Sequence, residues 1–560
     1  MCANKVESGA AILVDSLKQQ GVDRIFGYPG GVILGLFDAM YDDDFNCILV
    51  RHEQGATHAA EGYAKATGKT GAVIVTSGPG ASNTITGIAD AMMDSVPLVV
   101  FTGQVGHAVL GTEAFQELDI IGVSKPIVKA NFQPKNAAEL QQTIKRAFEI
   151  AQEGRKGPVL IDLPKDVLGG EATFDPDAKA QPEAKGQDFS TETLEAGLKA
   201  LSQAKKPIAI AGGGITLSEA TDEFNEFIHK WQLPTVSTLL GLGNVKDDDP
   251  LFLGMGGHHG TYASNMALAE TDFIVNIGSR FDDRLVPTPA GYTDGKTILH
   301  IDIDTKELNK TFETKFAVNA DAKAALKAIL ASDTQPGDTS EWRKTTAEWR
   351  GTKPDRAKGA DQPDTFDPEE VIAAAGRATN GDATVVTDVG QHQMWAAHAY
   401  QFNRPRQIIT SGGFGTMGYG LPAALGAKLA RPDKETILFV GDGGFQMTSE
   451  ELEVAATEDI NIKIFLLNNN VLGMIRQWQG AFFGQHYYRS EFHQQPDFEK
   501  LMEAYGLKYR KLSKDEDLDA QMKDIFADPA TTLIEVPVSD AEQAYPWVTP
   551  GHKNNEMIGM

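Results

Sequence analysis

Cysteine is almost absent from this chain of 560 residues, which contains only Cys2 and Cys47. Two isolated cysteines cannot build a disulfide framework, and they do not have the paired spacing of metal ligands. The sequence therefore argues against a disulfide-stabilised secreted protein. We expect a reducing compartment, by default the cytoplasm.

Long apolar runs and basic charge are also missing. No apolar run reaches the roughly 20 residues that a membrane-spanning helix needs. The first residues show neither a basic region followed by an apolar core nor an Arg/Ser-rich leader. The formal net charge is −26, which excludes a general basic field for nucleic acid or anionic membranes but leaves room for local phosphate sites. We expect binding to neither nucleic acid nor membrane.

What the chain does contain is an alternation of strand-like apolar runs with helical patterns, which predicts α/β domains with parallel sheets. The clearest runs are 72–75, 98–101, 159–162, 208–211, 273–277, 298–303, 385–387, 437–440, 464–467 and 533–536. Polar, proline-containing stretches at 169–187 and roughly 333–368 predict linkers. The expected fold is therefore three consecutive α/β domains, at 1–168, 188–335 and 366–560.

The stretch from Gly441 to Asn469 has the order strand, glycine-rich turn, helix, strand, Asn pair. Glycines at a strand end let backbone N–H groups approach phosphate oxygens, and the next helix offers its N-terminus to an anion. Asp442 and Asn469 offer the hard oxygen ligands that magnesium prefers. An ordinary turn with an exposed Asp is the alternative. The Asn pair at a second strand end favours a site for a diphosphate and a divalent cation.

This spacing resembles the cofactor motif of thiamine-diphosphate enzymes. The resemblance implies that Asp442 and Asn469 are magnesium ligands and that the backbone carbonyl of Val471 is the third ligand. The diphosphate would lie against the glycines of the turn, which are Gly441, Gly443 and Gly444.

Glu53 lies in the segment Arg51-His52-Glu53-Gln54, which opens a helix rich in small residues. Locally, Glu53 is explained equally well as a surface residue that compensates the helix dipole or as a partner of Arg51. Thiamine diphosphate requires a hydrogen bond at its pyrimidine N1′ before its 4′-imino group can remove the C2 proton, and a carboxyl in an apolar pocket can supply that bond. The segment resembles the one that carries this glutamate in thiamine-diphosphate enzymes, so Glu53 is the predicted activating residue.

Further motifs follow in order at 75–83, 97–104, 111–117, 154–159 and 163–167. Together they resemble the large catalytic subunit of acetohydroxyacid synthase, also called acetolactate synthase, and the resemblance extends from about Gly9 to the end. It implies that Phe115 and Gln116 lie near the reacting carbons, that Gly31 lies near C2, and that Lys165 lies at the substrate channel. A solvated surface cation is the alternative for Lys165.

The middle block contains a triple glycine at 212–214 and an Arg-rich loop at 278–284. Such a glycine turn permits close approach of a nucleotide diphosphate, which paired arginines can clamp. As a bare pattern, the loop is a charged turn with internal salt bridges. The block resembles the FAD domain of the same synthases. The implied flavin contacts are Arg155, His259, Arg280, Asp282, Arg284, Asp302, Ile303 and Asp321.

The last block carries Gln391 and His392 at a strand end, which the resemblance assigns to the diphosphate. It also implies that Met417 wedges beneath the cofactor and holds it bent, although a Met is otherwise a core filler. Met474 and Trp478 stand four residues apart on one helix face. Core packing explains that spacing, whereas the resemblance implies a pocket wall that selects the second 2-keto acid.

The resemblance implies an N-terminal pyrimidine-binding domain, a central FAD domain and a C-terminal domain for the diphosphate and magnesium. It implies a carboligase that decarboxylates pyruvate on thiamine diphosphate and transfers the two-carbon unit to pyruvate, giving 2-acetolactate, or to 2-ketobutyrate, giving 2-aceto-2-hydroxybutyrate. This is the first common step of branched-chain amino-acid biosynthesis. FAD would be structural. The expected assembly is a homodimer or homotetramer in which Glu53 reaches the partner's cofactor, with room for a small regulatory subunit.

Three alternatives stay open. A catabolic, FAD-independent acetolactate synthase would lack the loop of Arg280 and Arg284 and the run 477–479. A pyruvate oxidase shares the same plan and uses FAD for electron transfer. A non-catalytic nucleotide-binding protein would have no reason to keep Glu53 together with the metal pair.

Overall fold

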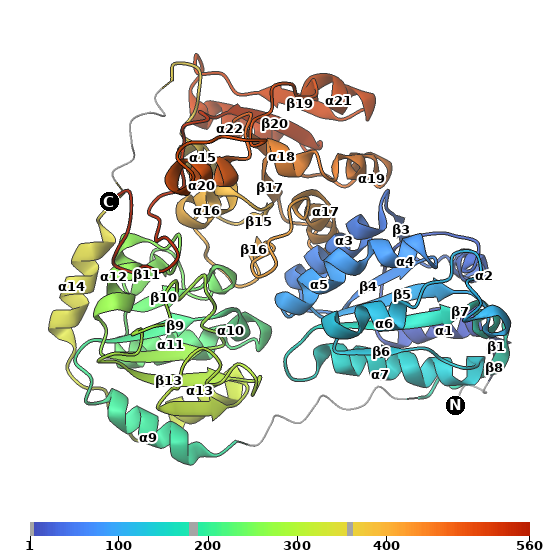
Figure 1. Cartoon of the computed structure of the whole chain (residues 1–560), viewed down its shortest axis with the longest axis horizontal. Coiled ribbons are helices and arrows are strands. Elements are labelled where there is room, and N and C mark those ends of the chain that lie inside the picture. The colour runs from blue at the N-terminus through green and yellow to red at the C-terminus, as the bar shows by residue number, and fades with distance from the viewer. Residues whose placement is uncertain (1–4, 179–188, 355–361) are drawn as a thin grey trace.

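The structure, a computed structural model, describes residues 5–178, 189–354 and 362–560. Three six-stranded parallel sheets follow one another along the chain, and Figure 1 shows the three domains that they form grouped around a common centre. The expected α/β plan with parallel sheets is confirmed. The domain boundaries remain predictions, because parts of both expected linkers, 179–188 and 355–361, lie outside the described residues.

The N-terminal sheet has the strand order β3-β2-β4-β5-β7-β6. Its strands are β2 (Ile25–Tyr28), β3 (Cys47–Leu49), β4 (Gly71–Val75), β5 (Leu98–Gln104), β6 (Ala130–Phe132) and β7 (Pro158–Pro164). Its helices are α1 (Gly9–Gln19), α2 (Leu34–Asp42), α3 (Glu53–Thr67), α4 (Pro79–Asn83), α5 (Ile85–Met93), α6 (Ile120–Ser124), α7 (Leu140–Gln152) and α8 (Lys165–Gly169). Alternate residues of β4 enter different cores, Val73 on one side and Ile74 on the other, so the sheet is buried on both faces.

The middle sheet has the order β11-β10-β9-β12-β13-β14. Its strands are β9 (Pro207–Ala211), β10 (Thr235–Ser237), β11 (Phe252–Met255), β12 (Phe273–Ile277), β13 (Thr297–Asp302) and β14 (Phe316–Asn319). Its helices are α9 (Thr191–Leu201), α10 (Gly213–Leu217), α11 (Thr221–Trp231), α12 (Tyr262–Glu270), α13 (Ala322–Ala331) and α14 (Ser340–Arg350). The strand order reverses between β9 and β12, which is where a doubly wound sheet opens a crevice for a dinucleotide.

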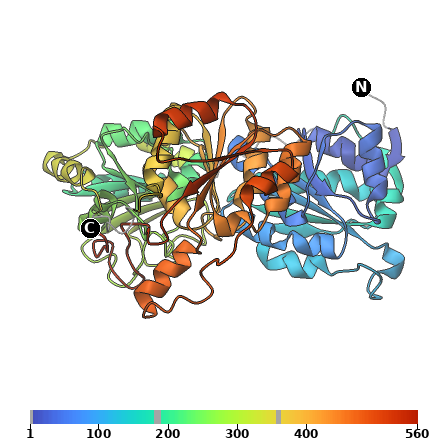
Figure 2. The same cartoon turned by 90° about the horizontal axis from the view of Figure 1, so that it is seen from above.

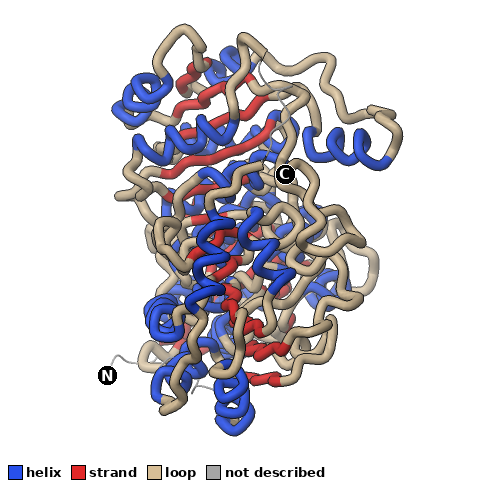
Figure 3. Tube along the Cα trace, turned by 90° about the vertical axis from the view of Figure 1, so that its left-hand side faces the viewer, coloured by secondary structure: helices blue, strands red, loops and turns tan. Residues whose placement is uncertain are grey.

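The C-terminal sheet has the order β16-β15-β17-β18-β20-β19, which repeats the order of the N-terminal sheet. Its strands are β15 (Thr384–Thr387), β16 (Ile408–Ile409), β17 (Thr436–Gly441), β18 (Lys463–Asn468), β19 (Lys508–Lys511) and β20 (Thr532–Pro537). Its helices are α15 (Pro368–Ala378), α16 (Gln391–Ala399), α17 (Gly420–Ala430), α18 (Asp442–Phe445), α19 (Leu452–Thr457), α20 (Gly473–Phe482), α21 (Phe498–Ala504) and α22 (Leu518–Ala527). Figure 3 shows strands of this sheet layered between helices.

The two segments expected to be linkers contain regular structure. In the first, β8 (Glu171–Phe174) pairs antiparallel with β1 (Lys5–Ser8). In the second, α14 packs on the middle domain, because Trp342 is buried and its Nε1 donates to the Pro207 carbonyl at 3.0 Å. Most of the other residues of α14 are charged or polar, which explains why its composition suggested a linker. In the part of the chain that the structure describes, no helix is long and apolar enough to cross a bilayer.

The N- and C-terminal domains meet through α3 and α17. Side chains from both helices share one hydrophobic core. The approach is so close that a Cβ on Gly62 would lie 2.0 Å from the carbonyl oxygen of Ala423. Figure 2 shows the C-terminal domain between the other two domains in the view from above.

Candidate active site

An open cavity of about 2050 Å³ lies where the three domains meet. Its walls include the carboxyl ends of β15 and β17 in the C-terminal domain and of β9 and β12 in the middle domain. Residues 93–95 and 152–156 of the N-terminal domain complete it. Both carboxyl-end walls lie at points where the strand order of a sheet reverses, the usual place for a ligand in such folds.

Gln391 and His392 begin α16, directly after β15. Gln391 Nε2 donates to Gln477 Oε1 and to the carbonyl of Glu542, both at 3.0 Å. Gln391 Oε1 and His392 Nε2 are buried without a hydrogen-bond partner. Burial lowers the pKa of His392 to about 4, so its imidazole is neutral. Orphaned polar atoms in a cavity wall are the feature expected of a site that binds a polar group.

The glycine turn after β17 brings backbone, not side chains, to the cavity. A Cβ on Gly441 would lie 3.1 Å from His392 Nδ1, and one on Gly443 would lie 2.6 Å from Leu472 Cδ2. A Cβ on Gly444 would lie 2.4 Å from Asp388 Oδ1. The turn therefore fits a diphosphate that approaches the main chain closely.

Asp442 and Asn469 come to the same edge of the sheet because they follow the neighbouring strands β17 and β18. Asp442 accepts hydrogen bonds from Gly443 N at 2.9 Å and from Gln495 Nε2, and burial raises its pKa to about 6. Asn469 Oδ1 accepts from Val471 N at 3.2 Å. Among the described residues, no three His, Cys, Asp or Glu side chains gather as a metal cluster. One carboxylate with amide and carbonyl oxygens fits magnesium on a diphosphate.

Met417 lies on a loop that runs from Thr410 to Gly418 along the cavity wall. The carboxylate of Asp388 fixes the end of this loop, since it accepts from Gly418 N at 3.0 Å and from Gly420 N at 2.8 Å. Burial raises the pKa of Asp388 to about 6. Met417 is half-buried rather than a core residue, which suits a support beneath a bound group.

All eight predicted flavin residues line this cavity, seven from the middle domain and Arg155 from the N-terminal domain. Gly212 and Gly278 meet at the strand-order reversal, where a Cβ on Gly212 would lie 2.0 Å from the Gly278 carbonyl oxygen. Burial raises the pKa of Asp302 to about 6, and Asp321 caps α13 by accepting from Ala324 N at 3.0 Å. Glycines at the switch point and an acidic residue after a strand fit a dinucleotide.

The cationic flavin residues already have protein partners. Arg155 pairs with Glu307 at 3.0 Å and with Asp304 at 3.3 Å. Arg284 pairs with Asp283, and Arg280 lies 3.3 Å from the sulfur of Met93. The loop at 278–284 therefore has the expected internal salt bridges, and it also lines the cavity.

Trp478 connects the C-terminal domain to His259 of the middle domain through stacked rings. It stacks on Trp547 with ring centres 6.2 Å apart, and Trp547 stacks on His259, also at 6.2 Å. His259 Nδ1 and Trp478 Nε1 are buried without partners. Met474, one turn before Trp478, both lines the cavity and packs against the core. Met474 therefore fits both interpretations, since it packs against the core and also forms part of the pocket wall.

The predicted catalytic and substrate-channel residues of the N-terminal domain lie outside this cavity, whereas Arg155 of the same domain lines it. Glu53, at the start of α3, is half-buried and accepts from Asn83 Nδ2 at 2.9 Å. Gly31 and Lys165 are exposed, Phe115 is 88% exposed, and Gln116 has a left-handed φ of 61°. One copy of the chain therefore does not bring these side chains to its own metal pair, and their roles remain predictions.

Comparison with known proteins identifies the family. The model of the thiamine pyrophosphate enzyme N-terminal TPP binding domain matches residues 7–123, that of the central domain 194–329, and that of the C-terminal TPP binding domain 388–536. The acetolactate synthase large subunit of Lactococcus lactis subsp. lactis is 48% identical over 99% of this chain and 97% of its own length. The chain belongs to the acetolactate synthase large-subunit family.

Other members of the family are similarly close. The acetolactate synthase large subunit of Haemophilus influenzae is 40% identical over 98% of each chain. The isozyme 2 large subunit of Escherichia coli is 39% identical over 98% of this chain and 99% of its own length. The match confirms a thiamine-diphosphate-dependent enzyme, with two thiamine-diphosphate domains around a central one.

Several residues that shape this synthase-family site were not predicted. Asp388 was not assigned a role, although it follows a strand as Asp442 does. Gln495 reaches Asp442 from a segment that has no pattern. Asp90 and Asp94 bind the Met417 loop across domains. The position of Asp388 at a strand end could have identified it from the sequence. The contacts of Gln495, Asp90 and Asp94 could not be identified in this way, because they form only in the folded chain.

Proposed function

We propose that this protein catalyses the acetolactate synthase reaction, in which pyruvate loses CO2 and its two-carbon unit joins a second 2-keto acid. The observation that carries the proposal is the single cavity that contains both the Asp442–Asn469 pair and the dinucleotide crevice of the middle domain. Neither half alone separates this synthase from other thiamine-diphosphate enzymes. The relatives that carry the printed name acetolactate synthase support the same activity.

Thiamine diphosphate, when bound, supplies the electron sink for decarboxylation and carbon–carbon bond formation. Asp442, Asn469 and the Val471 carbonyl would hold magnesium on its diphosphate, with Gln391 and His392 beside the same group. Met417 would support the ring system from below. The side chain of Glu53 would donate a hydrogen bond to the pyrimidine, which is the role expected of a carboxyl at that atom.

FAD would occupy the crevice between β9 and β12, with Arg280 and Arg284 toward its phosphates and Asp302 and Asp321 toward its ribose end. For those arginines to bind phosphate, the ion pairs with Asp282 and Asp283 would have to open or be shared. We propose a structural flavin, because the acetolactate reaction transfers no net electrons. The FAD-independent synthase stays the second candidate.

The second 2-keto acid would lie against Trp478 and Met474. These side chains line the same cavity as the metal pair, and Trp547 backs the ring of Trp478. An apolar pocket wall favours an added methylene by about 1–3 kcal/mol. We therefore propose that the site accepts 2-ketobutyrate as well as pyruvate.

The assembly would be a homodimer or homotetramer. Glu53, Gly31, Phe115 and Lys165 lie outside the cavity of their own chain, so a second copy would complete the site. Phe115 is 88% exposed in one copy, and contact with a second copy would remove its apolar ring from water. The name "large subunit" of the relatives supports a small regulatory partner. We place this assembly in the cytoplasm, in keeping with the two cysteines.

The test is product analysis of the purified protein with pyruvate, magnesium and thiamine diphosphate, with and without added FAD. Acetolactate that depends on FAD is the expected result. Acetolactate from protein shown to be flavin-free would favour the FAD-independent synthase. Peroxide or acetyl phosphate would mean that the protein is an oxidase. Equimolar pyruvate and 2-ketobutyrate in one reaction would then give the preference for the second substrate.

A further inference from the structure

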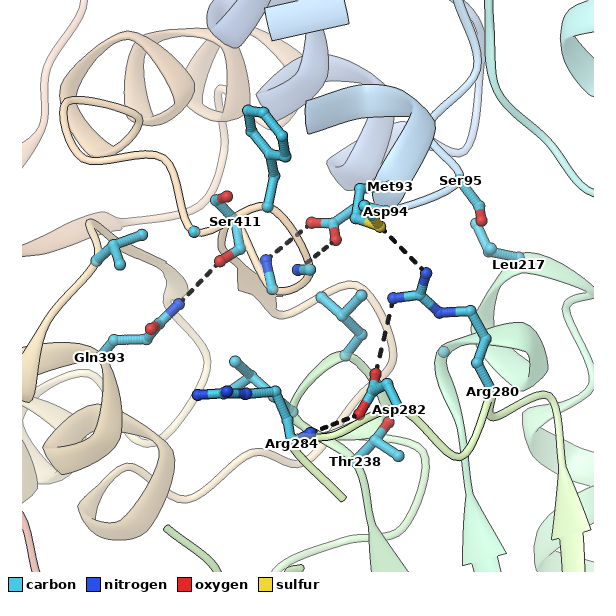
Figure 4. Close-up of a pocket in the computed structure, with 18 of the residues that line it drawn as sticks. Met93, Asp94, Ser95, Leu217, Thr238, Arg280, Asp282, Arg284, Gln393 and Ser411 are labelled. Atoms are coloured by element: carbon cyan, nitrogen blue, oxygen red, sulfur yellow. Dashed lines mark hydrogen bonds and ion pairs between the residues drawn. The ribbon is translucent and has the colours of Figure 1, made fainter. Parts of the chain in front are cut away.

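The loop from Thr410 to Met417 is held by a helix of another domain. Asp94, at the end of α5 in the N-terminal domain, accepts hydrogen bonds from Gly412 N at 2.9 Å and from Gly413 N at 2.7 Å. Each carboxylate oxygen therefore receives one backbone donor. Figure 4 shows Asp94 beside Ser411 and close to Arg280, at the point where the three domains meet.

One turn earlier in α5, Asp90 binds the same loop through its side chains. Its Oδ2 accepts from Ser411 Oγ at 2.6 Å and from Thr416 Oγ1. Ser411 Oγ in turn accepts from Thr416 N at 2.9 Å. Both ends of the turn before Met417 are thus fixed to one buried carboxylate.

Lys65 of α3 completes the arrangement from beneath. Its ammonium donates to Asp94 at 2.8 Å and to the Thr410 carbonyl at 2.6 Å, and it lies 4.9 Å from the ring centre of Tyr419. Burial acts to lower the pKa of Lys65, but the surrounding acidic groups, Asp94 first among them, together raise it well above its ordinary value. The charge of Asp94 is therefore paired, which a buried carboxylate needs.

The neighbouring carboxyl of Glu61 belongs to the same buried group. Burial and the nearby carboxylate of Asp90 raise its pKa well above the ordinary value, so it stays protonated. His58 Nδ1 lies 2.9 Å from Glu61 Oε1, and burial lowers the pKa of His58 to about 3. Both groups are therefore uncharged in place, which fits a fixed support rather than a proton relay.

We propose that Asp90 and Asp94 are positioning residues for the thiamine-diphosphate site, acting as a carboxylate clamp that fixes the backbone on which Met417 stands. The inference rests on the proposed function, because it assigns Met417 to the cofactor. Asp388 holds the loop just after Met417, and the clamp holds it just before. Met417 is thereby fixed from two sides, one of them supplied by the N-terminal domain of the same chain.

The matched control for the clamp lies in the middle domain. Asp272 accepts from Lys206 N at 2.9 Å and from Lys205 N at 2.8 Å, which is the geometry of Asp94 with Gly412 and Gly413. Asp272 does not line the cavity. Asp272→Asn and Asp94→Asn therefore perturb equivalent pairs of backbone hydrogen bonds, and only the second touches the loop and the ion pair with Lys65.

The first measurement is backbone hydrogen–deuterium exchange by mass spectrometry on the full-length protein without cofactor. In Asp94→Asn, one carboxylate oxygen becomes an NH2 group that faces a donor, so we expect about tenfold faster exchange in the peptide covering 410–417. In Asp272→Asn, the faster exchange should appear around 205–206 instead. Unchanged exchange at 410–417 in Asp94→Asn would overturn the clamp.

The second measurement is the exchange rate of the thiazolium C2 proton of bound thiamine diphosphate, followed by NMR after acid quench. We expect a decrease of about 100-fold in Asp94→Asn, the usual effect of a displacement of about 1 Å, and no change in Asp272→Asn. If the wild-type protein itself does not accelerate C2 exchange, the proposed function fails. If the wild type accelerates it and Asp94→Asn matches the wild type, the clamp fails and the function stands.

Ser411→Ala covers the case in which Asp94→Asn does not fold. It removes both the donor to Asp90 and the acceptor for Thr416 N, and it leaves every charge in place. We expect faster exchange at 410–417 and slower C2 exchange, as in Asp94→Asn. Asp90→Asn alone should stay close to the wild type in both exchange rates, because its amide oxygen can still accept from the hydroxyls of Ser411 and Thr416. Asp90→Ala should show faster exchange at 410–417 and slower C2 exchange. Wild-type values in Ser411→Ala would also overturn the clamp.

Discussion

The carboxylate of Glu451, in the C-terminal domain, accepts a hydrogen bond from the backbone N–H of His52 at 3.0 Å. Glu451 also accepts from Arg51 N at 3.1 Å, and it is 1% exposed. These two donors directly precede Glu53 at the start of α3. One domain therefore fixes the backbone from which another domain presents its predicted activating residue.

Glu451 should make folding stability depend on pH. Burial raises its pKa from 4.5 to about 7, although the two N–H donors oppose this. Because the folded state favours the protonated form, the stabilisation is complete below the unfolded pKa and is lost as the pH rises through about 7. At 1.36 kcal/mol per pKa unit, this is on the order of 3 kcal/mol. Glu451→Gln removes the titration, so its melting temperature should fall less than that of the wild type between pH 5 and pH 8.

The control for that experiment is Glu458→Gln, on an exposed carboxylate after α19. It should reproduce the wild-type pH dependence, because it leaves Glu451 and its two backbone donors in place. If the melting temperatures of Glu451→Gln and the wild type changed by the same amount between pH 5 and pH 8, the assigned role of Glu451 would be contradicted.

Glu53→Gln should lower the carboligation rate by about 100-fold to 10,000-fold, the range expected when a group that takes part in proton transfer is lost. FAD binding should not change, because Glu53 lies outside the cavity that would hold the flavin. Steady-state acetolactate formation and flavin absorbance after gel filtration measure the two quantities. Asn83→Ala, which removes the donor to Glu53, should cause a smaller loss. Near-normal turnover in Glu53→Gln would remove Glu53 from the mechanism.

Asp442→Ala should weaken magnesium-dependent binding of thiamine diphosphate by at least about 100-fold, since even indirect partners of metal ligands cost 10-fold to 100-fold when removed. Titration of tryptophan fluorescence with cofactor, at several magnesium concentrations, measures this. Asp433→Ala, at an exposed position before β17, is the matched control and should bind as the wild type does. An unchanged titration in Asp442→Ala would mean that the metal lies elsewhere.

The sequence predicted those parts of the molecule that depend on local pattern. Strands such as β4 and β17 were found because parallel strands buried on both faces are continuous apolar runs. The metal pair was found because Asp442 and Asn469 both follow strands, and parallel strands bring their carboxyl ends to one edge. The eight flavin residues were predicted from the family resemblance alone, because no sequence spacing links them to one another.

Contacts between distant segments could not be predicted in this way. Asp90 lies 321 residues from Ser411, inside a helix whose pattern is that of ordinary packing. The sequence offers Arg51 as a partner of Glu53, but its guanidinium donates to the Leu49 carbonyl at 2.7 Å and pairs with Glu453 at 3.6 Å instead. Composition suggested a linker where α14 forms, because Trp342 and Trp349 dock a helix whose other side chains are mostly charged or polar.

The contact between α3 and α17 allows a test of how closely the two thiamine-diphosphate domains must meet. A Cβ on Gly426 would lie 1.8 Å from the carbonyl oxygen of Ala59, and no flexible side chain can move aside to make room. Gly426 is inside a helix, where Ala alone would add about 1 kcal/mol of stability.

The clash should outweigh that gain, so we expect Gly426→Ala to destabilise the protein by about 1–3 kcal/mol, the usual cost of overpacking. Gly35→Ala, in α2 with open space around the added methyl, is the control and should be neutral or slightly stabilising. Thermal unfolding of both variants, followed by circular dichroism, measures the difference. If Gly426→Ala were as stable as Gly35→Ala, α3 and α17 could move apart without a loss of folding stability. The packing between these helices would then not be what holds the start of α3 against Glu451.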